Sequence, residues 1–419
     1  MGKLIIEGGK RLEGTINLQG SKNSALPVLA ATVAVRGVNV IHNCPRISDV
    51  SATVKILEHL GCRVKTENST VTVDSTNINS SEIPEDIMRK MRSSIIFLGP
   101  LLSRTSKACV GFPGGCEIGL RPIDLHISAM KSLGVTVIED SGMLRCECMK
   151  RMKAARILLA FPSVGATENI MISAATAKGT TVILNAAREP EVCDLARFLN
   201  ACGARIFGAG QSTVRIEGVS ELHPCEHTVI PDRIAASTYM ACAAVTGGNV
   251  TIDGVIPEHL DCVIPEFEAT GCDFAISKNT LNIKAPMKLK NFRKIKTMPY
   301  PGFPTDSQAL IMAVASVAKG TSIFVENIFE SRFRHVPELN RLGAHITVED
   351  NRVAVVEGVS HLIGAPVAAT DLRGGCALVV AGLAAQGVTT VNLTDYIDRG
   401  LEKPEIYLTA LGAEIKRID

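Results

Sequence analysis

Tryptophan is absent from this 419-residue sequence, and aromatic residues make up only 4% of it. Proteins that bind single-stranded nucleic acid stack bases on aromatic side chains, so this composition argues against that class. The net charge is also small, +2 at pH 7, so the chain lacks the bulk attraction of a basic protein for nucleic acid or for an anionic membrane. Neither nucleic acid nor a membrane surface is therefore expected as a partner.

Long apolar runs are missing as well. No stretch reaches the roughly 18 uninterrupted apolar residues of a membrane span, and residues 1–10 contain no apolar core of a signal peptide. Thirteen cysteines without a secretion signal indicate a reducing compartment, and we expect the protein to be cytoplasmic. No CxxC pair and no His/Cys cluster has zinc spacing, so no metal site is expected.

The chain contains a sixfold internal repeat. Glycines expected to end a helix recur at intervals of 73, 69, 68, 72 and 69 residues: Gly61, Gly134, Gly203, Gly271, Gly343 and Gly412. Glycine at such a place fits a left-handed helix C-cap. Short alternating runs follow, such as residues 63–66 with 70–73 and 345–348 with 352–356, and they predict hairpin strands with one buried face. Each repeat is therefore interpreted as β-α-β-α-β-β.

The length of the chain exceeds what one core usually fills, so the six repeats predict two domains with three repeats each. The third repeat ends near Val219, and the connection to the second domain is expected within residues 221–228. The predicted fold class is α/β, with helices packed inside sheets.

Polar residues recur where the first helix of each repeat is expected to begin: Ser21-Lys22-Asn23, Met91-Arg92-Ser93, Ser163-Val164-Gly165, Asp232-Arg233, Thr305-Asp306 and Thr370-Asp371. Equivalent positions in a repeat take equivalent places in a pseudo-symmetric domain, so three helix N-termini should cluster in each domain. Helix N-termini attract anions. Ser163, Thr305 and Thr370 would also suit simple helix capping. Recurrent cations are poor caps, and they favour a site for a polyanionic ligand.

One further segment, residues 111–126, sets Gly114, Gly115 and Gly119 around the thiol of Cys116 and places Arg121 five residues later. Glycine allows close approach to a ligand, arginine presents a planar fork to phosphate, and a nearby cation favours the thiolate. Pro122 is expected to start a helix with Asp124 and His126 in its first turn. A surface turn with an incidental cysteine is the alternative, because most cysteines are structural or inert.

Together these segments resemble the UDP-N-acetylglucosamine 1-carboxyvinyltransferases, the enolpyruvyl transferases of peptidoglycan synthesis in the EPSP synthase-like family. The resemblance extends from Leu4 to Ile415, and its most specific phrases are residues 20–23, 90–94, 113–126, 161–167, 185–191, 231–233, 300–306, Arg332, 370–373 and 397–400. It implies a two-domain inside-out α/β barrel, with residues 20–229 in the first domain and residues 1–19 and 230–419 in the second. The implied reaction transfers the enolpyruvyl group of phosphoenolpyruvate to the 3-hydroxyl of UDP-N-acetylglucosamine and releases phosphate, without a cofactor or a metal.

The same resemblance implies roles for single residues. Cys116 is the expected proton donor, and Asp306 is the expected base toward the sugar hydroxyl. Phosphoenolpyruvate is expected on Lys22, Asn23, Arg121 and Arg399, of which Lys22 and Arg399 also count as catalytic, with Arg373 close by. The nucleotide sugar is expected on Arg92, Arg121, Pro122, Ile123, Asp124, Leu125, Ser163, Val164, Gly165, Thr305, Asp306 and Ile328. His126 and Arg332 are further candidates, although a helical histidine more often caps or packs.

Two other functions stay open at this point. The sister transferase that acts on shikimate 3-phosphate shares the implied fold, although the phrase Pro113-Gly-Gly-Cys116 argues against it. A catalytically weak paralogue could bind the nucleotide sugar as a regulatory partner, although the presence of Cys116, Asp306, Lys22 and Arg399 argues for activity. The sequence does not predict an oligomeric state.

Overall fold

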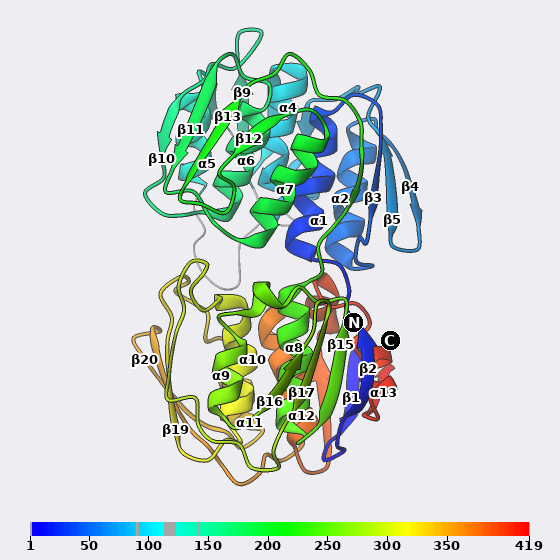
Figure 1. The fold of residues 1–419 in the computed structure, drawn as a ribbon, viewed down its shortest axis with the longest axis vertical. Coiled ribbons are helices and arrows are strands. Elements are labelled where there is room, and N and C mark those ends of the chain that lie inside the picture. Colours follow the sequence, from blue (N-terminus) through cyan, green and yellow to red (C-terminus); the bar gives the residue numbers. More distant parts are fainter. Residues whose placement is uncertain (1, 89–91, 113–122, 141, 419) are drawn as a thin grey trace. The chain divides into compact units, whose positions relative to one another are not determined.

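The computed structural model describes residues 2–88, 92–112, 123–140 and 142–418 (Figure 1). These residues divide into two compact units, each with its own apolar core. The first unit runs from Gly20 to Ile230, and the second takes in the chain up to Gln19 and from Pro231 onward. Six four-stranded sheets with accompanying helices are present in the described residues, which confirms the predicted α/β class.

The first unit contains three sheets of the same design. In spatial order they are β14 (Glu226–Thr228), β3 (Val38–His42), β5 (Thr70–Asp74), β4 (Arg63–Glu67); β6 (Glu82–Ile83), β7 (Lys107–Gly111), β9 (Met143–Glu147), β8 (Thr136–Asp140); and β10 (Arg156–Leu158), β11 (Thr180–Leu184), β13 (Thr213–Glu217), β12 (Arg205–Phe207). The first two strands of each sheet are parallel, and the other pairs are antiparallel. The helical segments are α1 (Lys22–Ala31), η1 (Thr32–Ala34), α2 (Ser48–His59), α3 (Glu85–Met88), η2 (Arg92–Phe97), α4 (Leu98–Thr105), α5 (Asp124–Ser132), α6 (Val164–Ala174) and α7 (Pro190–Ala201).

Strand β14 changes one expectation about the connection after the third repeat. Residues 226–228 lie within the segment predicted as a connection, but they form a strand that pairs in parallel with β3. The sheet of the first repeat thus takes its edge strand from the end of the unit. A three-residue strand with the sequence Glu-His-Thr is too short and too polar to give an alternating signal.

The second unit repeats the design, with strands from both ends of the chain. Its sheets are β16 (Asp273–Ile276), β17 (Thr280–Lys284), β15 (Asn249–Asp253), β2 (Glu13–Asn17); β18 (Lys294–Lys296), β19 (Thr321–Val325), β21 (Val353–Glu357), β20 (His345–Glu349); and β22 (Pro366–Ala368), β23 (Val388–Asn392), β1 (Lys3–Glu7), β24 (Glu414–Ile418). Its helical segments are α8 (Arg233–Val245), η3 (Pro257–Leu260), α9 (Ile264–Ala269), α10 (Thr305–Ala315), α11 (Val336–Arg341), α12 (Leu372–Ala384), η4 (Thr394–Arg399) and α13 (Pro404–Ala410).

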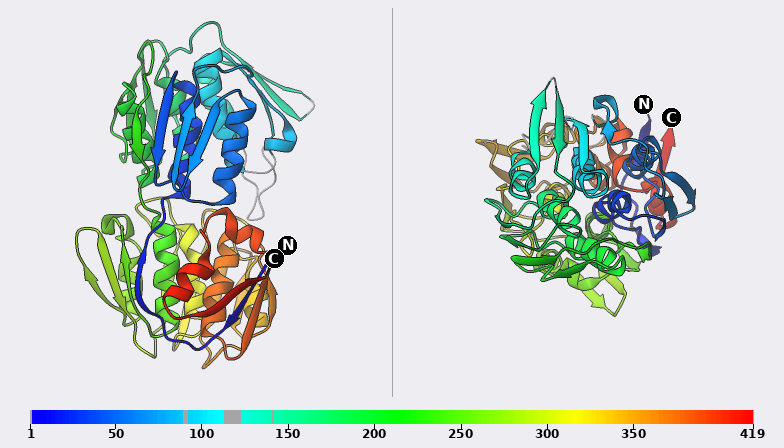
Figure 2. Two further views of the ribbon diagram at one scale, coloured as in Figure 1. Left: turned by 90° about the vertical axis from the view of Figure 1, so that its right-hand side faces the viewer. Right: turned by 90° about the horizontal axis from the view of Figure 1, so that it is seen from above.

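Helices α8, α10 and α12 pack against one another inside the sheets of the second unit (Figures 1 and 2). A helix that is apolar all round belongs in an interior, and α12 is of this kind because its residues 374–383 are all buried. Small residues permit the close packing. A Cβ added at Gly375 would lie 2.8 Å from Cγ1 of Ile397, so a larger residue there would displace η4.

The six glycines of the repeat confirm the predicted helix ends. Each lies two residues beyond α2, α5, α7, α9, α11 or α13, and all six have φ between 82° and 100°. The left-handed backbone is strained for residues with a Cβ, so the chain places glycine where each helix turns back into a hairpin. The two hairpins expected from alternation are present as β4–β5 and β20–β21.

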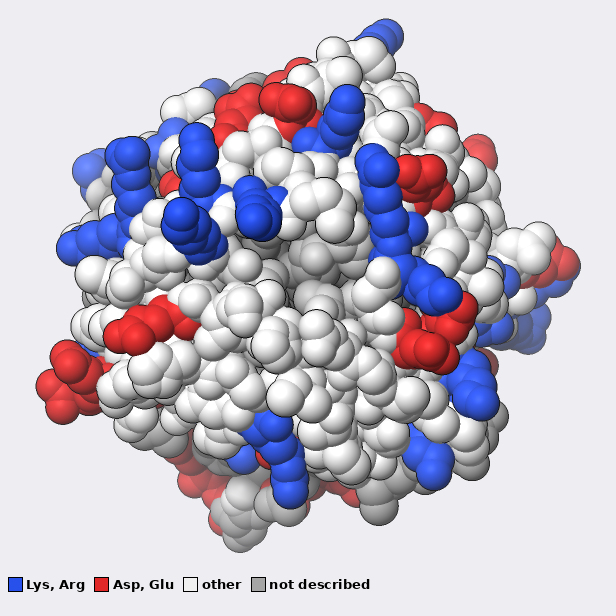
Figure 3. All heavy atoms as spheres, turned by 90° about the horizontal axis from the view of Figure 1, so that it is seen from below, with Lys and Arg blue, Asp and Glu red and all other residues white. Residues whose placement is uncertain are grey.

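Charge is interspersed on the face shown in Figure 3. Lys and Arg side chains lie mainly toward its rim with acidic side chains between them, and its middle is mostly uncharged. Among the described residues, no helix has the length and apolar character to cross a bilayer, and no group of three or more His, Cys, Asp or Glu is placed to hold a metal ion.

Candidate active site

Asp306 is the centre of a charged cluster in the second unit. It lies in the first turn of α10, where the free N–H groups of the helix favour an anion. Nη2 of Arg332 lies 2.9 Å from its Oδ1, and Nη2 of Arg373 at the start of α12 lies 2.8 Å from its Oδ2. Arg332 also donates to the carbonyl of Thr305 from Nε and Nη2. The structure therefore brings together three residues named from the sequence.

These cations determine the protonation state of Asp306. Burial alone would raise the pKa of this carboxyl, but the charges of Arg373, Arg332 and Arg233 outweigh burial and hold the pKa well below its usual range. The Asp306 side chain keeps 28% of its exposure, so it is open to a ligand while both arginines are almost buried. In this arrangement Asp306 is a carboxylate at neutral pH, and it is weakly basic.

Glu326, which the sequence interpretation missed, joins two expected sugar contacts. Its buried carboxylate accepts a hydrogen bond from Thr305 Oγ1 at 3.0 Å. The other oxygen accepts from the backbone N–H groups of Ile328 and Phe329 at 2.8 and 3.1 Å. Because one carboxylate holds the start of α10 and the loop after β19, Thr305 and Ile328 are fixed relative to each other. A lone Glu after a strand gives no sequence signal for this role.

Arg399 lies at the end of η4, and a second arginine holds that segment. Arg417 of β24 donates to both carboxylate oxygens of Asp398 at 2.8 and 2.9 Å and to both oxygens of Glu405 at 3.1 Å. Paired hydrogen bonds between arginine and carboxylate fix geometry as well as charge. Arg417 thus positions the residue next to Arg399, and the sequence interpretation missed it because the contact joins separate strands and turns.

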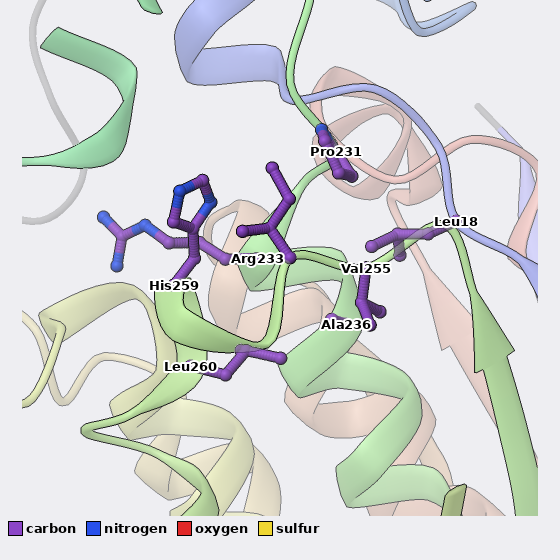
Figure 4. A pocket seen from close by; sticks show the side chains of 8 residues that line it. Leu18, Pro231, Arg233, Ala236, Val255, His259 and Leu260 are labelled. Atoms are coloured by element: carbon purple, nitrogen blue, oxygen red, sulfur yellow. The ribbon is translucent and has the colours of Figure 1, made fainter. Parts of the chain in front are cut away.

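Arg233, the first residue of α8, borders a small hollow (Figure 4). Leu18, Pro231, Val255 and Leu260 supply apolar walls, and the Arg233 and His259 side chains extend to the same side. Its empty space is about 160 Å³. Pockets for drug-sized ligands have volumes of roughly 300–1,000 Å³. This hollow leaves almost no room for even a water-sized sphere, so it does not account for a nucleotide sugar.

In the first unit, Lys22 begins α1 and is almost buried. Its Nζ lies 2.7 Å from Oδ2 of Asp49, in the first turn of α2, and the side chains are 10% and 4% exposed. Gly20 makes the close approach before α1 possible, because a Cβ there would lie 1.7 Å from the carbonyl oxygen of Asn43. Asn23 is partly exposed beside Lys22. Asp49 is therefore a partner that the sequence interpretation did not name.

A buried carboxylate also anchors the start of α1. Asp194 of α7 accepts hydrogen bonds from the Ser24 hydroxyl and from the N–H of Ile230, while Nη2 of Arg197 lies 3.0 Å and Nε2 of His227 lies 3.2 Å from its Oδ1. Burial opposes ionisation of Asp194, but the contacts of His227, Ser24 and Arg197 together hold its pKa below the ordinary value. This network ties α1, α7 and the end of the unit together.

We expect Asp194→Asn to destabilise the protein by about 1.5–3 kcal/mol at pH 7, the range for hydrogen bonds to a charged group. Because the pKa of Asp194 is lower folded than unfolded, its ionised form stabilises the fold above the unfolded value of about 3.9. That contribution is lost as the pH falls through the folded pKa. Urea unfolding between pH 7 and pH 3 should show the gap between wild type and variant closing in acid. Asp86→Asn, at an exposed position, is the control; a gap that stays constant with pH would contradict this prediction.

The start of α6 meets His126 of α5. Ser163 caps α6 by accepting a hydrogen bond from the N–H of Ala166 at 3.3 Å, the alternative role considered for it from the sequence. A Cβ added at Gly165 would lie 3.3 Å from Cε1 of His126, so the ring lies directly against this turn. Nδ1 of His126 lies 3.0 Å from Nδ2 of Asn169. Among the expected sugar contacts, Val164 and Leu125 are partly exposed, Asp124 is exposed, and Ile123 is buried.

Two of the three residues that would suit helix capping, Thr305 and Thr370, do not cap. Thr305 is already inside α10, where its hydroxyl bonds Glu326. Thr370 does not cap α12; Asp371 does, by accepting hydrogen bonds from the N–H groups of Arg373 and Gly374 at 3.0 and 3.1 Å. A carboxylate is as good a cap as a hydroxyl and also complements the helix dipole.

Several of the site residues expected from the sequence lie partly or wholly outside the residues that the structure describes. Cys116, Arg121 and Pro122 lie outside the described residues, and Arg92 is described only as the first residue of η2. Helix α5 begins at Asp124, so Asp124 and His126 do lie in its first turn.

Known proteins are similar in sequence to this chain over its whole length. Residues 6–405 match the family model described as EPSP synthase (3-phosphoshikimate 1-carboxyvinyltransferase). The chain belongs to the EPSP synthase family. Within that family, UDP-N-acetylglucosamine 1-carboxyvinyltransferase 2 of Caldanaerobacter subterraneus subsp. tengcongensis is 51% identical over 418 residues, covering 100% of both chains. UDP-N-acetylglucosamine 1-carboxyvinyltransferase of Geobacter metallireducens is 47% identical, also over 100% of both.

Solved structures of EPSP synthase-family members share the fold. The enolpyruvyl transferase NikO from Streptomyces tendae aligns with a TM-score of 0.90 at 26% identity, over 99% of this chain and 98% of that one. An EPSP synthase from Acinetobacter baumannii aligns with a TM-score of 0.76 at 17% identity, over 100% of both chains, which concerns the fold alone. The predicted enolpyruvyl transferase fold is thereby confirmed.

Proposed function

We propose that this protein transfers the enolpyruvyl group of phosphoenolpyruvate to the 3-hydroxyl of UDP-N-acetylglucosamine and releases phosphate, the first committed step of peptidoglycan synthesis. The observation that carries the proposal is the Asp306 carboxylate, partly exposed at a helix start between two buried arginines. It occurs in a chain whose full-length relatives, at 46–51% identity, are named for this activity.

The chemistry assigns an acid and a base. The thiol of Cys116 delivers a proton to the methylene carbon of phosphoenolpyruvate while the sugar hydroxyl oxygen bonds the neighbouring carbon, and Asp306 takes the hydroxyl proton. The bond from that carbon to the phosphate oxygen then breaks, and loss of a methyl proton restores the double bond. General acid–base catalysis of this kind contributes about 10²–10⁴-fold.

Asp306 needs a change in its surroundings to act as a base, because a carboxylate held by two cations has a weak affinity for protons. Arg373 donates one hydrogen bond to Asp306, whereas Arg332 also donates to the carbonyl of Thr305 and is held in place by it. An arriving anion competes with Asp306 for Arg373, and withdrawal of that cation raises the proton affinity of Asp306. Substrate binding thus prepares the base.

The remaining assignments concern binding. Lys22, Asn23, Arg121 and Arg399 hold the phosphate and carboxylate of phosphoenolpyruvate, since cations stabilise charge best where water is excluded. The residues proposed to bind the nucleotide sugar are Arg92, Arg121 to Leu125, Ser163 to Gly165, Thr305, Asp306 and Ile328. The buried pair of Lys22 and Asp49 keeps the lysine oriented before the anion arrives.

Phosphate release separates the candidate functions. We expect purified protein to release phosphate from phosphoenolpyruvate when UDP-N-acetylglucosamine is the acceptor, and not when shikimate 3-phosphate replaces it. Turnover with shikimate 3-phosphate alone would identify the sister activity. Binding of the nucleotide sugar by calorimetry without any phosphate release would identify a regulatory paralogue, and either result would overturn the proposal.

A further inference from the structure

Two cysteines of the first unit lie sulfur to sulfur, away from the residues assigned to the reaction. Cys202 follows α7 directly, and Cys225 directly precedes β14. Their Sγ atoms are 3.3 Å apart, and both are free thiols. A disulfide has an S–S distance of about 2.05 Å, so a small side-chain movement would bring the sulfurs to bonding distance.

The backbone on both sides of the pair is anchored, so the approach is built into the fold. The N–H of His223 donates to the carbonyl of Cys202 at 2.9 Å. The N–H of Cys225 donates to Oδ1 of Asn39 at 3.2 Å, and its carbonyl accepts from the N–H of Val40 at 3.2 Å. Helix α7 and the segment before β14 are therefore held against each other with the thiols between them.

The two thiols differ in access and in acidity. Cys202 has no exposed surface, whereas Cys225 is partly exposed. The hydrogen bond from Cys202 lowers the pKa of the Cys225 thiol, and the same contact, with burial, raises the pKa of Cys202. Burial instead raises the pKa of other described cysteines, among them Cys44, Cys62, Cys146, Cys193, Cys242 and Cys272. The thiolate is the reactive form, so Cys225 is the nucleophile of the pair and Cys202 the buried second thiol.

We propose that Cys202 and Cys225 form a dithiol site that a low-molecular-weight disulfide converts into an intramolecular disulfide. The Cys225 thiolate bonds one sulfur of the reagent, whose S–S bond breaks and whose other half leaves as a thiol after taking a proton. Cys202 then loses its proton to solvent and bonds Sγ of Cys225, and the second half of the reagent leaves as a thiol. Two protein thiols are oxidised, and one reagent disulfide is reduced to two thiols.

The second step is fast because Cys202 is already in place. A nucleophile held next to its target reacts as if it were present at very high concentration. In the mixed disulfide Cys225 no longer accepts a hydrogen bond from Cys202, so the contact that raises the pKa of Cys202 is gone. The mixed disulfide is therefore a short-lived intermediate in the wild-type protein, and it accumulates only when Cys202 is absent.

Bis(2-hydroxyethyl) disulfide is a suitable probe, because it is small and uncharged. The reduced full-length protein is treated with it, remaining thiols are blocked with N-ethylmaleimide, and tryptic peptides are mapped without reduction. Trypsin releases Cys202 in residues 198–205 and Cys225 in residues 216–233, so the disulfide joins two separable peptides. We expect this joined pair as the main disulfide between two peptides of the first unit.

The variants test the order of the two steps. Cys202→Ser should carry one mercaptoethanol group on Cys225, and Cys225→Ser should carry none on Cys202. Cys193, half-buried on the same helix α7, is the internal control in residues 189–197, and Cys225 should react on the order of tenfold faster than it does. Absence of the joined peptides from the wild-type protein, while Cys193 reacts, would overturn the proposal without bearing on the transferase reaction. Equal labelling of Cys193 and of Cys225 in Cys202→Ser would overturn it as well.

Discussion

Asp306→Asn is expected to lower the turnover number by about 10²–10⁴-fold while leaving the protein folded. Asparagine has nearly the same shape, but it does not take up a proton at neutral pH. Its amide oxygen can still accept one hydrogen bond from Arg332 or Arg373, which are the two contacts of the carboxylate. The nucleotide sugar should therefore still bind, and the loss should appear in kcat more than in KM.

A matched control separates this effect from a general loss of charge. Asp273→Asn removes an exposed carboxylate from β16 of the same unit, and it should retain wild-type turnover. Phosphate release under saturating substrates gives kcat, and calorimetry gives the affinity for UDP-N-acetylglucosamine. If Asp306→Asn turned over at a rate close to wild type, another group would take the proton from the sugar hydroxyl.

The sequence predicts those features of the fold that depend on local spacing. The glycine positions are the clearest case, because a helix that turns back into a hairpin needs a left-handed residue at one point, and glycine takes it with least strain. Hairpins such as β4–β5 follow from alternation for the same reason. Because the chain has six repeats, the same local pattern of glycines and alternating residues recurs six times and is easier to recognise.

Long-range partners could not be predicted in this way. Each of four residues contacts, from another element of the chain, a segment that carries a proposed site residue: Asp49, Asp194, Glu326 and Arg417. Their residue types are ordinary for helix starts and strand ends, so a single sequence gives no reason to connect them. Strand β14 was not predicted for a related reason: its pairing with β3 joins residues almost 190 positions apart, such as Glu226 with Val40.

Equivalent helix starts differ in which side chain caps the helix. Ser163 caps its helix, a role that its residue type allows, whereas at Thr370-Asp371 the carboxylate caps the helix and the threonine does not. Both residue types cap well, so only the backbone direction before the helix decides between neighbours. Asp306 does not cap α10, because the helix already begins at Thr305. Its carboxylate instead accepts hydrogen bonds from Arg332 and Arg373.

Cys116 is expected to be the thiol that an epoxide bearing a phosphonate, such as fosfomycin, modifies. The phosphonate resembles the phosphate of phosphoenolpyruvate, so the cations assigned to that substrate should hold it and leave the epoxide beside the thiol. The thiolate attacks an epoxide carbon, the ring opens, and the alkoxide takes a proton. UDP-N-acetylglucosamine should accelerate the reaction, because its binding completes the site around the anion.

This prediction requires the epoxide to modify Cys116 in preference to every other cysteine of the chain. Twelve other cysteines compete, among them Cys225, whose pKa is lowered by its hydrogen bond with Cys202. Cys225 lies in the first unit beside Cys202 with no role in the phosphate clamp, so it should react with a small neutral disulfide and not with the anionic epoxide. We therefore expect the two reagents to separate the thiols by their neighbours: Cys116 by the cations proposed to bind phosphate, and Cys225 by a second thiol.

Peptide mass mapping after fosfomycin treatment tests both the residue and its role. We expect one adduct, on Cys116, formed faster with the nucleotide sugar present, and turnover lost in step with it. Cys116→Asp should take no adduct and keep part of its turnover, since a carboxylic acid can still donate a proton, whereas Cys116→Ala should lose about 10²–10⁴-fold. Label spread over several cysteines, or activity lost without label at Cys116, would mean that this thiol is an ordinary turn residue and that the proton donor lies elsewhere.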